Sequence, residues 1–296
     1  MFLPDFKKQM GNYSNVINEE LMKYIPSASN GQREVAKAMK YSLSNGGKRL
    51  RPMLVLEFCK MCGGDVKKAL PYACAIEFIH TYSLIHDDLP CMDNDDMRRG
   101  KPSCHKMYGE AIALLAGDAL LTHAFEVCSS ADLPAENNLN AVSLLAQNAG
   151  VGGMIGGQVV DLDSEGKPIT EETVRYMYRL KTGCLLKAPA LIAIAAAGAE
   201  STEAAAHLLG YTETVGLAFQ IKDDILDVEG DAAILGKKTG QDAKEEKSSM
   251  TAVMGVPYCK TLLQDLTKQA MARADFFGDR GAFLRDMASY LLVREN

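Results

Sequence analysis

The chain carries two clusters of aspartates that are far apart in the sequence. The first, DDLPCMD, spans residues 87–93, and the second, DDILD, spans residues 223–227. Carboxylates that share one site repel each other, so such clusters persist where water or cations neutralise them. Sites that offer only oxygen ligands favour hard cations, of which Mg²⁺ is the first expectation. If both clusters face one cavity, they would hold several Mg²⁺ ions, and a diphosphate is the natural ligand of such an arrangement.

A run of charged residues is most often a solvated face, but the second cluster argues against that interpretation. Asp223 and Asp227 are four residues apart and therefore share one face of a helix, while Ile221 and Ile225 supply an apolar side. Like charges at this spacing destabilise a helix unless a cation lies between them. The spacing therefore indicates a helical face that binds metal.

The first cluster cannot work in the same way. Asp87 and Asp93 are separated by roughly 600° of rotation on a regular helix, so they cannot share a face. Pro90 also disfavours a helix that continues through this stretch. We therefore expect a helix that carries Asp87 and Asp88 near its C-terminal end, followed by a bend that returns Asp93 to the same ion.

Basic segments accompany the acidic clusters, at residues 46–52, 98–101, 181–183 and 236–247. The first of these, GGKRLRP, combines glycines that let backbone amides approach a phosphate with Arg51, which can bind it through two hydrogen bonds. Two of the other segments follow the acidic clusters directly. The combination predicts a metal-bridged diphosphate that is also bound by lysine and arginine.

Composition favours an all-helical, soluble protein. Of the 296 residues, 47% are hydrophobic and 24% are charged, which is ordinary for a globular chain, and Ala, Leu and Met are abundant. The net charge of −6 gives no reason to expect a nucleic-acid partner. We expect a cytoplasmic protein with no targeting segment and no membrane span, because the longest apolar run, residues 188–199, is too short and contains Pro189.

Helical periodicity recurs along most of the chain, with Gly, Pro and Asn-rich breaks between the segments. The expected breaks are residues 27–31, 63–65, 98–103, 132–138, 164–168 and 230–241. Thr170 should be the N-cap of the helix that follows the break at 164–168. About ten helices in a single domain over residues 1–296 are predicted, with the eight cysteines reduced.

Taken together, the motifs resemble those of the trans-isoprenyl diphosphate synthases, also called the polyprenyl synthetase family. The matching segments are residues 79–93 with 98–102 for the first aspartate-rich motif, residues 219–227 for the second, and residues 46–52, 181–183 and 236–237 in the family's order. The resemblance covers residues 40–250. It is nearest to the bacterial farnesyl diphosphate synthase type, whose first motif also has four residues between its acidic ends.

The resemblance implies a fold, an activity and an assembly. The fold would be the all-α isoprenoid-synthase bundle, with its helices around a central cavity. The activity would be the condensation of isopentenyl diphosphate with dimethylallyl or geranyl diphosphate, head to tail, to give farnesyl diphosphate. A geranylgeranyl diphosphate synthase is the alternative within the family, and a homodimer is the expected assembly.

The resemblance also assigns roles to individual residues. The metal ligands would be Asp87, Asp93 and Asp223, supported by Asp88 and Asp227, with about three Mg²⁺ ions when substrate is bound. The allylic diphosphate would be bound by Arg98, Lys181 and Lys237. Isopentenyl diphosphate would be bound by Lys48, Arg51, His80 and Arg99, with Gly47 in the same turn. The developing cation would be faced by Lys181, Thr182 and Gln220, while Gln158, Asp161 and Lys247 complete the site.

A mechanism follows from these charges. Cations stabilise the departing diphosphate, so that its C–O bond ionises to an allylic carbocation. The isopentenyl double bond attacks this carbocation, and C2 then loses a proton, with the released diphosphate as the expected base. Water would quench the cation, so we expect residues 230–247 to close over the site.

Product length can be argued from the helix that precedes the first cluster. Tyr82 stands five residues before Asp87, about 7.5 Å along the helix axis, which is a little more than one isoprene unit. Its ring would therefore act as a floor beneath a C15 product, whereas Ser83 is too small to stop the chain alone. The alternative is that Tyr82 only fills the core.

Four other interpretations remain open. His86-Asp87 suggests a His-Asp phosphohydrolase, which needs another histidine upstream, and the chain has none before His80. Glu77 and His80 form one E-x-x-H pair, whereas a di-iron bundle needs two. Terpene cyclases and head-to-head synthases usually lack the second acidic motif, the basic turn at residues 46–52, or both. A non-catalytic member of the same family is the binding-module alternative.

Overall fold

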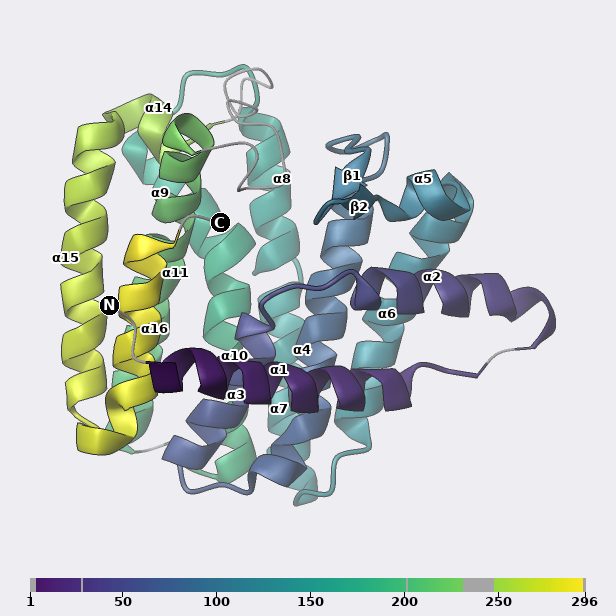
Figure 1. The fold of residues 1–296 in the computed structure, drawn as a ribbon, viewed down its shortest axis with the longest axis horizontal. Helices are drawn as coiled ribbons and strands as arrows, with labels where there is room; N and C mark the ends of the chain where they lie inside the picture. The colour runs from purple at the N-terminus through teal and green to yellow at the C-terminus, as the bar shows by residue number, and fades with distance from the viewer. Residues whose placement is uncertain (1–3, 28, 201, 231–247, 295–296) are drawn as a thin grey trace.

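Helices supply almost all the regular structure of the part of the chain that the computed structural model describes, residues 4–27, 29–200, 202–230 and 248–294. The helices of the bundle are α3 (Leu50–Met61), α4 (Val66–Asp87), α6 (Glu110–Ser129), α7 (Ala135–Ala149), α8 (Met154–Ser164), α10 (Cys184–Ala197), α11 (Glu203–Glu229), α15 (Val256–Asp275) and α16 (Ala282–Val293). They run up and down the molecule around the central helix α10, as Figure 1 shows. The predicted all-helical fold is confirmed.

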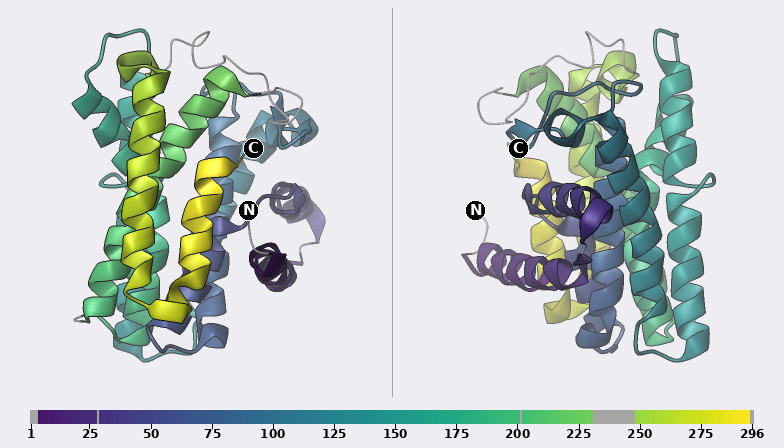
Figure 2. Two further views of the ribbon diagram at one scale, coloured as in Figure 1. Left: turned by 60° about the vertical axis from the view of Figure 1, so that its left-hand side comes forward. Right: turned by 90° about the vertical axis from the view of Figure 1, so that its right-hand side faces the viewer.

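Two helices cross one face of this bundle. α1 (Pro4–Tyr24) and α2 (Arg33–Ser44) lie beside each other and roughly perpendicular to the long helices (Figures 1 and 2). Each buries an apolar face, with Phe6, Ile17 and Leu21 on α1 and Met39 and Leu43 on α2. The pair therefore covers the bundle on the side where α3 begins.

Helix α4 brings the first acidic cluster to one end of the bundle. Asp65 caps its N-terminus by accepting a hydrogen bond from the Lys67 amide at 2.9 Å. Most of its side chains are buried, and it packs between α3 and α6. It ends at Asp87 with Asp88 as its C-cap, two residues before Pro90, as the sequence predicts.

The segment after α4 contains a short hairpin that the helical pattern does not predict. β1 (Met97–Arg98) pairs antiparallel with β2 (Lys101–Pro102), and α5 (Cys104–Tyr108) follows. Arg99 and Gly100 form the turn, with φ of 53° and 74°. A positive φ at both turn residues is typical of two-residue hairpins. Strands of two residues are too short to show a period in the sequence.

A continuous helical segment contains a π-helical turn. α9 (Glu171–Tyr178) runs through η2 (Arg179–Gly183) into α10, and η2 is the π-helical turn. Thr170 is the N-cap of α9, as predicted, and accepts a hydrogen bond from the Thr173 amide at 3.3 Å. A π-helical turn inside an α-helix shifts the residues after it to a new face.

The C-terminal part of the described chain packs along α11. α14 (Met250–Met254), α15, the short turn η3 (Gly278–Gly281) and α16 form this layer. At the other end of the chain, the short turn η1 (Asn30–Gln32) lies between α1 and α2. α6 and the segment Glu171–Ala197 are apolar and long enough to cross a membrane by length and composition alone. Both pack against neighbouring helices of the bundle, and core helices of soluble proteins pass the same test.

Candidate active site

The bend after α4 brings the ends of the first acidic cluster together. The backbone amide of Asp93 donates to the carbonyl of Asp87 at 2.8 Å, and the amide of Asn94 donates to the carbonyl of Leu89 at 3.1 Å. The predicted return of Asp93 toward Asp87 is therefore confirmed. Burial raises the pKa of Asp87 to about 6, while Lys181 opposes this shift and Asp93 adds to it.

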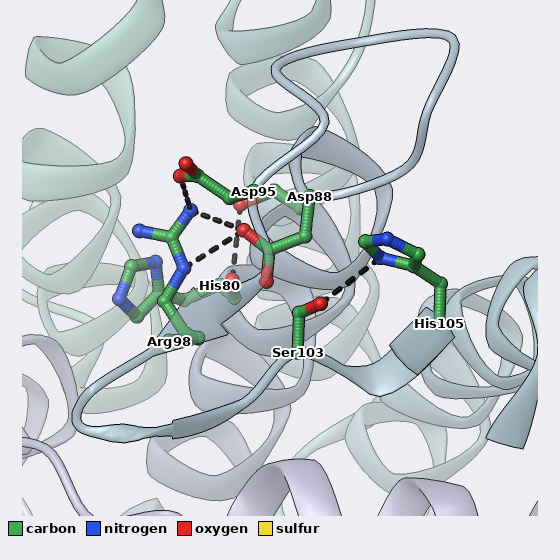
Figure 3. A network of polar contacts seen from close by, with 7 residues as sticks. His80, Asp88, Asp95, Arg98, Ser103 and His105 are labelled. Atoms are coloured by element: carbon green, nitrogen blue, oxygen red, sulfur yellow. Dashed lines mark hydrogen bonds and ion pairs between the residues drawn. The ribbon is translucent and has the colours of Figure 1, made fainter. Parts of the chain in front are cut away.

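Asp88 holds the first arginine of the hairpin. Its buried carboxylate accepts hydrogen bonds from Arg98, from Nε at 2.9 Å and from Nη2, and the same Nη2 reaches Asp95 at 3.2 Å (Figure 3). Two donors of one guanidinium on the same carboxylate oxygen, Oδ1 of Asp88, fix the direction of the guanidinium. Asp88 therefore positions Arg98 beside the first cluster, and its expected part as a supporting metal ligand stays a prediction.

The second cluster lies on α11 with the predicted helical geometry. Asp223 is half-exposed and Asp227 is buried one turn further along. The carboxylate of Asp223 pairs with Nη2 of Arg294 at 2.6 Å, and that guanidinium lies 4.1 Å from the centre of the Phe219 ring. Sequence reasoning missed Arg294, because a single cation near the end of the chain carries no motif.

Asp224 has a structural part in the same cluster. Its buried carboxylate accepts hydrogen bonds from the Tyr178 hydroxyl at 2.6 Å and from the Met250 amide at 2.9 Å, and the Gln220 amide lies 3.3 Å away. These contacts join α11 to α9 and α14. Tyr178 was also missed, since a tyrosine at a helical core position looks like any other apolar residue.

The turn η2 places the predicted cation-facing residues together. The Thr182 hydroxyl donates to the side-chain carbonyl of Gln220 at 2.8 Å, and Nζ of Lys181 pairs with Asp161 at 2.5 Å. α8 approaches this turn so closely that a Cβ at Gly157 would collide with the backbone nitrogen of Lys181. Gly157 is therefore the contact that lets α8 and η2 pack.

The basic residues predicted for the second diphosphate also gather at one place. Gly47 has φ of 120°, and a Cβ there would collide with the guanidinium of Arg99, which donates to the carbonyl of Gly46. Arg51 and His80 both line the neighbouring cavity. Burial, and then the charges of Arg51 and Arg99, hold the pKa of His80 well below its usual value, so the imidazole is neutral at pH 7.

A buried ion pair holds the turn that carries these cations. Arg49 has φ of 51°, and its Nη1 pairs with Glu77 at 2.6 Å, while its Nε donates to Asn18 at 2.8 Å. Both charged side chains are almost fully buried. Glu77 is thus committed to Arg49, and the di-iron interpretation, which needs it as a ligand, is wrong.

An apolar cavity of about 550 Å³ extends from these groups into the bundle. Asp87, Lys181, Thr182 and Gln158 lie on its wall with leucine, isoleucine and methionine side chains. Tyr82 is 4% exposed and lines the cavity, its ring 5.7 Å from that of His86 in an edge-on contact. Ser83 also lines the cavity, with its hydroxyl bonded to the carbonyl of His80 at 2.9 Å.

Lys237 and Lys247, and the predicted closure by residues 230–247, lie outside the described residues except for Gly230. The other predicted site residues are described. Eight of them line the cavity: Arg51, His80, Tyr82, Ser83, Asp87, Gln158, Lys181 and Thr182. Asp161 and Gln220 contact Lys181 and Thr182, whereas Asp223 pairs with Arg294 and is not part of the cavity lining. The closure therefore stays a prediction.

The acidic clusters fit a divalent cation by their chemistry. Asp87 is a carboxyl with a raised pKa beside another carboxylate, which is the condition that a cation relieves. Among the described residues, no three His, Cys, Asp or Glu side chains are already grouped around one point. Carboxylates from α4 and α11 would therefore share ions with oxygens of the substrate, as Mg²⁺ commonly does with phosphates.

Comparison with known proteins places this site in a family. A sequence model of the polyprenyl synthetase family matches residues 32–276. The chain is 40% identical to the farnesyl diphosphate synthase of Escherichia coli, over 98% of its own length and 99% of that protein. It is also 40% identical to the geranylgeranyl diphosphate synthase of Cyanophora paradoxa, over 95% of its own length and 94% of that protein.

A solved structure extends the likeness to the fold. The geranyltransferase of Helicobacter pylori, complexed with magnesium and isoprenyl diphosphate, superposes with a TM-score of 0.85 at 32% identity. The alignment covers 99% of this chain and 97% of that one. The helical bundle, the two acidic clusters and the basic turn thus occur in a chain that is related along its length to these enzymes. The chain belongs to the polyprenyl synthetase family and is a prenyltransferase.

Proposed function

We propose that this prenyltransferase is a farnesyl diphosphate synthase, which condenses isopentenyl diphosphate with dimethylallyl and geranyl diphosphates. The observation that carries the proposal is the apolar cavity that begins at Asp87 and Lys181 and runs past Tyr82. Its volume of about 550 Å³ is in the usual range for sites that bury a small ligand. The apolar walls would bury an isoprenoid chain, and Lys181 and a cation on Asp87 would bind its diphosphate.

Each group at the mouth has a part in the proposed reaction. Arg98 and Lys181 bind the allylic diphosphate and stabilise the charge that grows on it as the C–O bond breaks. The Thr182 hydroxyl and the Gln220 carbonyl, which are hydrogen-bonded to each other at 2.8 Å, would present their oxygen atoms to the allylic carbon. The apolar walls exclude water from the cation. The released diphosphate then removes the proton from C2 of the new unit, so no side chain has to act as the base.

Isopentenyl diphosphate is proposed to bind in the neighbouring basic pocket. Lys48, Arg51 and Arg99 supply positive charge there, close to the negative charges of Asp223 and Glu77. His80, neutral at pH 7, contributes a hydrogen bond rather than a charge. This pocket is predominantly basic, whereas the proposed site of the allylic diphosphate carries the first acidic cluster. The two diphosphates would therefore bind at different places.

Asp87, Asp93 and Asp223, with Asp88 and Asp227 in support, would hold about three Mg²⁺ ions on the allylic diphosphate. The bound ions would neutralise the leaving diphosphate. One oxygen of Asp223, Oδ1, pairs with Arg294 at 2.6 Å, so this oxygen becomes available to a cation only when the pair opens.

The proposal of a C15 product rests on Tyr82. Its buried ring lines the cavity about 7.5 Å along the axis of α4 from Asp87, where a growing chain would meet it. A C20 product is the alternative, because one of the relatives at 40% identity is a geranylgeranyl diphosphate synthase. Removal of the ring should therefore lengthen the product.

The test compares Tyr82→Ala with Tyr82→Phe. The alanine variant should release products of C20 or longer from geranyl and isopentenyl diphosphates, measured by chromatography after the diphosphate is hydrolysed. The phenylalanine variant keeps the ring and should still stop at C15. An alanine variant that still makes only C15 would show that Tyr82 is a core residue and not the floor.

The working molecule is proposed to be a soluble, cytoplasmic homodimer in which residues 1–296 form one domain. Leu115 on α6 and Leu139 on α7 are large apolar side chains that lie exposed and do not line the 550 Å³ cavity. Exposed apolar surface commonly marks a protein interface, so α6 and α7 are the proposed site of the dimer contact. Light scattering in solution should give the mass of two chains, and the mass of one chain would contradict the dimer.

A further inference from the structure

A second cavity lies on the other side of η2 from the site described above. Its volume is about 760 Å³, and α9, η2, α10, α11 and the α7–α8 connection line it. It shares no lining residue with the 550 Å³ cavity. Nothing in the proposed reaction uses it.

The lining of this second cavity combines positive charge with apolar surface. Its basic side chains are Arg175, Arg179 and Lys187, and Glu213 is its carboxylate. Lys187 pairs with Glu213 at 2.6 Å, whereas Arg179 lies 5.2 Å from the ring of Tyr176 and has no carboxylate partner in the described part of the chain.

The apolar part of the lining is supplied by three leucines, Leu180, Leu191 and Leu217. Sites that bury a small ligand usually combine such a lining with a few placed polar groups. A ligand that suits this lining carries a negative group and an apolar body.

The turn η2 is a wall of both cavities. Lys181 and Thr182 line the first cavity, while Arg179 and Gly183 of the same turn line the second. α11 packs tightly against this wall, because a Cβ at Gly216 would lie 3.3 Å from the Cα of Gly183. A ligand that displaced η2 from one cavity would therefore move residues that line the other.

Tyr178 makes a second connection between the two sites. It lines the second cavity, and its hydroxyl donates to Asp224 at 2.6 Å, next to the metal-binding face of α11. A ligand that contacts this ring would thus also touch the residue that fixes α11.

We propose that the second cavity binds an amphipathic anion, a phosphate or diphosphate on an apolar chain of isoprenoid length, and that its binding is coupled through η2 to Lys181 and Thr182. Arg179 and Lys187 would bind the anionic group, and the leucines would cover the chain. Coupling between two sites is reciprocal, so a ligand here changes the catalytic site and substrates change the affinity here.

Two cysteines report on the two cavities separately. Cys184 is half-buried and lines the second cavity, whereas Cys91 is exposed and lines the first. The experiment measures the rate at which iodoacetamide alkylates each thiol in the full-length protein, by peptide mass spectrometry, as farnesyl monophosphate is added. Inorganic phosphate alone and farnesol alone are the comparison probes.

Farnesyl monophosphate should protect both thiols, and each comparison probe should protect Cys184 much less. In the double variant Arg179→Gln, Lys187→Gln, protection of Cys184 should need at least tenfold more probe, while protection of Cys91 stays unchanged. Lys68→Gln, which breaks a comparable ion pair with Asp132 elsewhere on the surface, is the matched control and should behave as the native protein. Alkylation rates are compared with and without probe within each variant, because burial raises the pKa of the Cys184 thiol and the charges of Lys187 and Arg179 oppose this shift.

A kinetic measurement tests the coupling. With both substrates saturating, competition in the first cavity disappears, so a change of kcat of twofold or more on addition of farnesyl monophosphate belongs to the second cavity. The double variant should turn over normally without the probe and lose this response.

Four results would overturn the proposal. The first is that Cys184 remains unprotected while Cys91 is protected. The second is that protection of Cys184 is as strong in the double variant as in the native protein. The third is that kcat stays constant although Cys184 is protected. Protection of Cys184 that depends on protein concentration without any probe would mean that another copy of the chain covers the cavity, and this too would overturn the proposal.

Discussion

At the scale of single residues, the site depends on charges that other charges hold in place. Arg98 is directed by Asp88, and Lys181 is directed by Asp161. Arg49 does not line either cavity, yet it is bound to Glu77 at 2.6 Å beside the turn that carries the cations for isopentenyl diphosphate. Such a pair acts on the reaction only through the groups that it positions.

Glu77→Gln should therefore affect both stability and substrate binding. It leaves the buried Arg49 charge without its carboxylate, which typically costs about 3 kcal/mol of the free energy of unfolding. The KM for isopentenyl diphosphate should rise more than kcat falls, because the turn at residues 46–51 loses its support. Chemical denaturation and steady-state kinetics measure the two effects.

Asp163→Asn is the matched control, since it removes an exposed ion pair with Lys167 and should leave the denaturation midpoint unchanged. If Glu77→Gln folds as stably as the native protein and keeps its KM, the positioning role of the Arg49–Glu77 pair is refuted.

The pH dependence of isopentenyl diphosphate binding should reflect Lys48. Burial, and then the nearby charge of Arg294, lower the pKa of Lys48 to about 8. Because the depressed pKa means that the charge is lost as the pH rises through 8, the KM for isopentenyl diphosphate should increase between about pH 7.5 and pH 9. Lys48→Arg stays charged over this range and should flatten the profile. A KM that does not change with pH in the native protein would contradict this assignment.

At the scale of elements, the catalytic groups come from helix ends and from one irregular turn. The ends of α4 and α11 carry the carboxylates, and η2 carries Lys181 and Thr182. The spacing of residues 87–93 was sufficient to predict the end of α4 and the bend between Asp87 and Asp93, and the spacing of residues 223–227 predicted a shared face of a helix. The π-helical turn could not be predicted, because its side chains look like a continuing α-helix until the contact of Gly157 with Lys181 is known.

Gly157→Ala should disturb this contact selectively. A methyl group there collides with backbone and not with a movable side chain, so α8 or η2 has to shift. We expect kcat to fall at least tenfold. Gly152→Ala lies in the neighbouring connection, where a Cβ has open space, and should keep most of the activity. Equal kcat values for the two variants would show that η2 tolerates displacement.

At the scale of the whole molecule, the layers of the bundle bring together residues that are far apart in the chain. α4, α6, α8 and η2 converge on one cavity, and α11 packs against η2 beside it, while α1 and α2 cover the side from which the basic turn enters α3 (Figure 1). The sequence predicts that the acidic and basic motifs meet at one site, because a metal-bridged diphosphate needs both carboxylates and cations. It does not predict Arg294 on Asp223 or the second cavity, since both depend on packing between α16, α11 and α10 that no motif encodes.

The most direct test of the proposed function is a condensation assay with the native protein. Isopentenyl diphosphate is supplied with either dimethylallyl or geranyl diphosphate, with and without Mg²⁺, and the products are separated by chain length. We predict farnesyl diphosphate as the main product from both starters, and no product when Mg²⁺ is removed with a chelator. Failure to elongate either starter in the presence of Mg²⁺ would contradict the account.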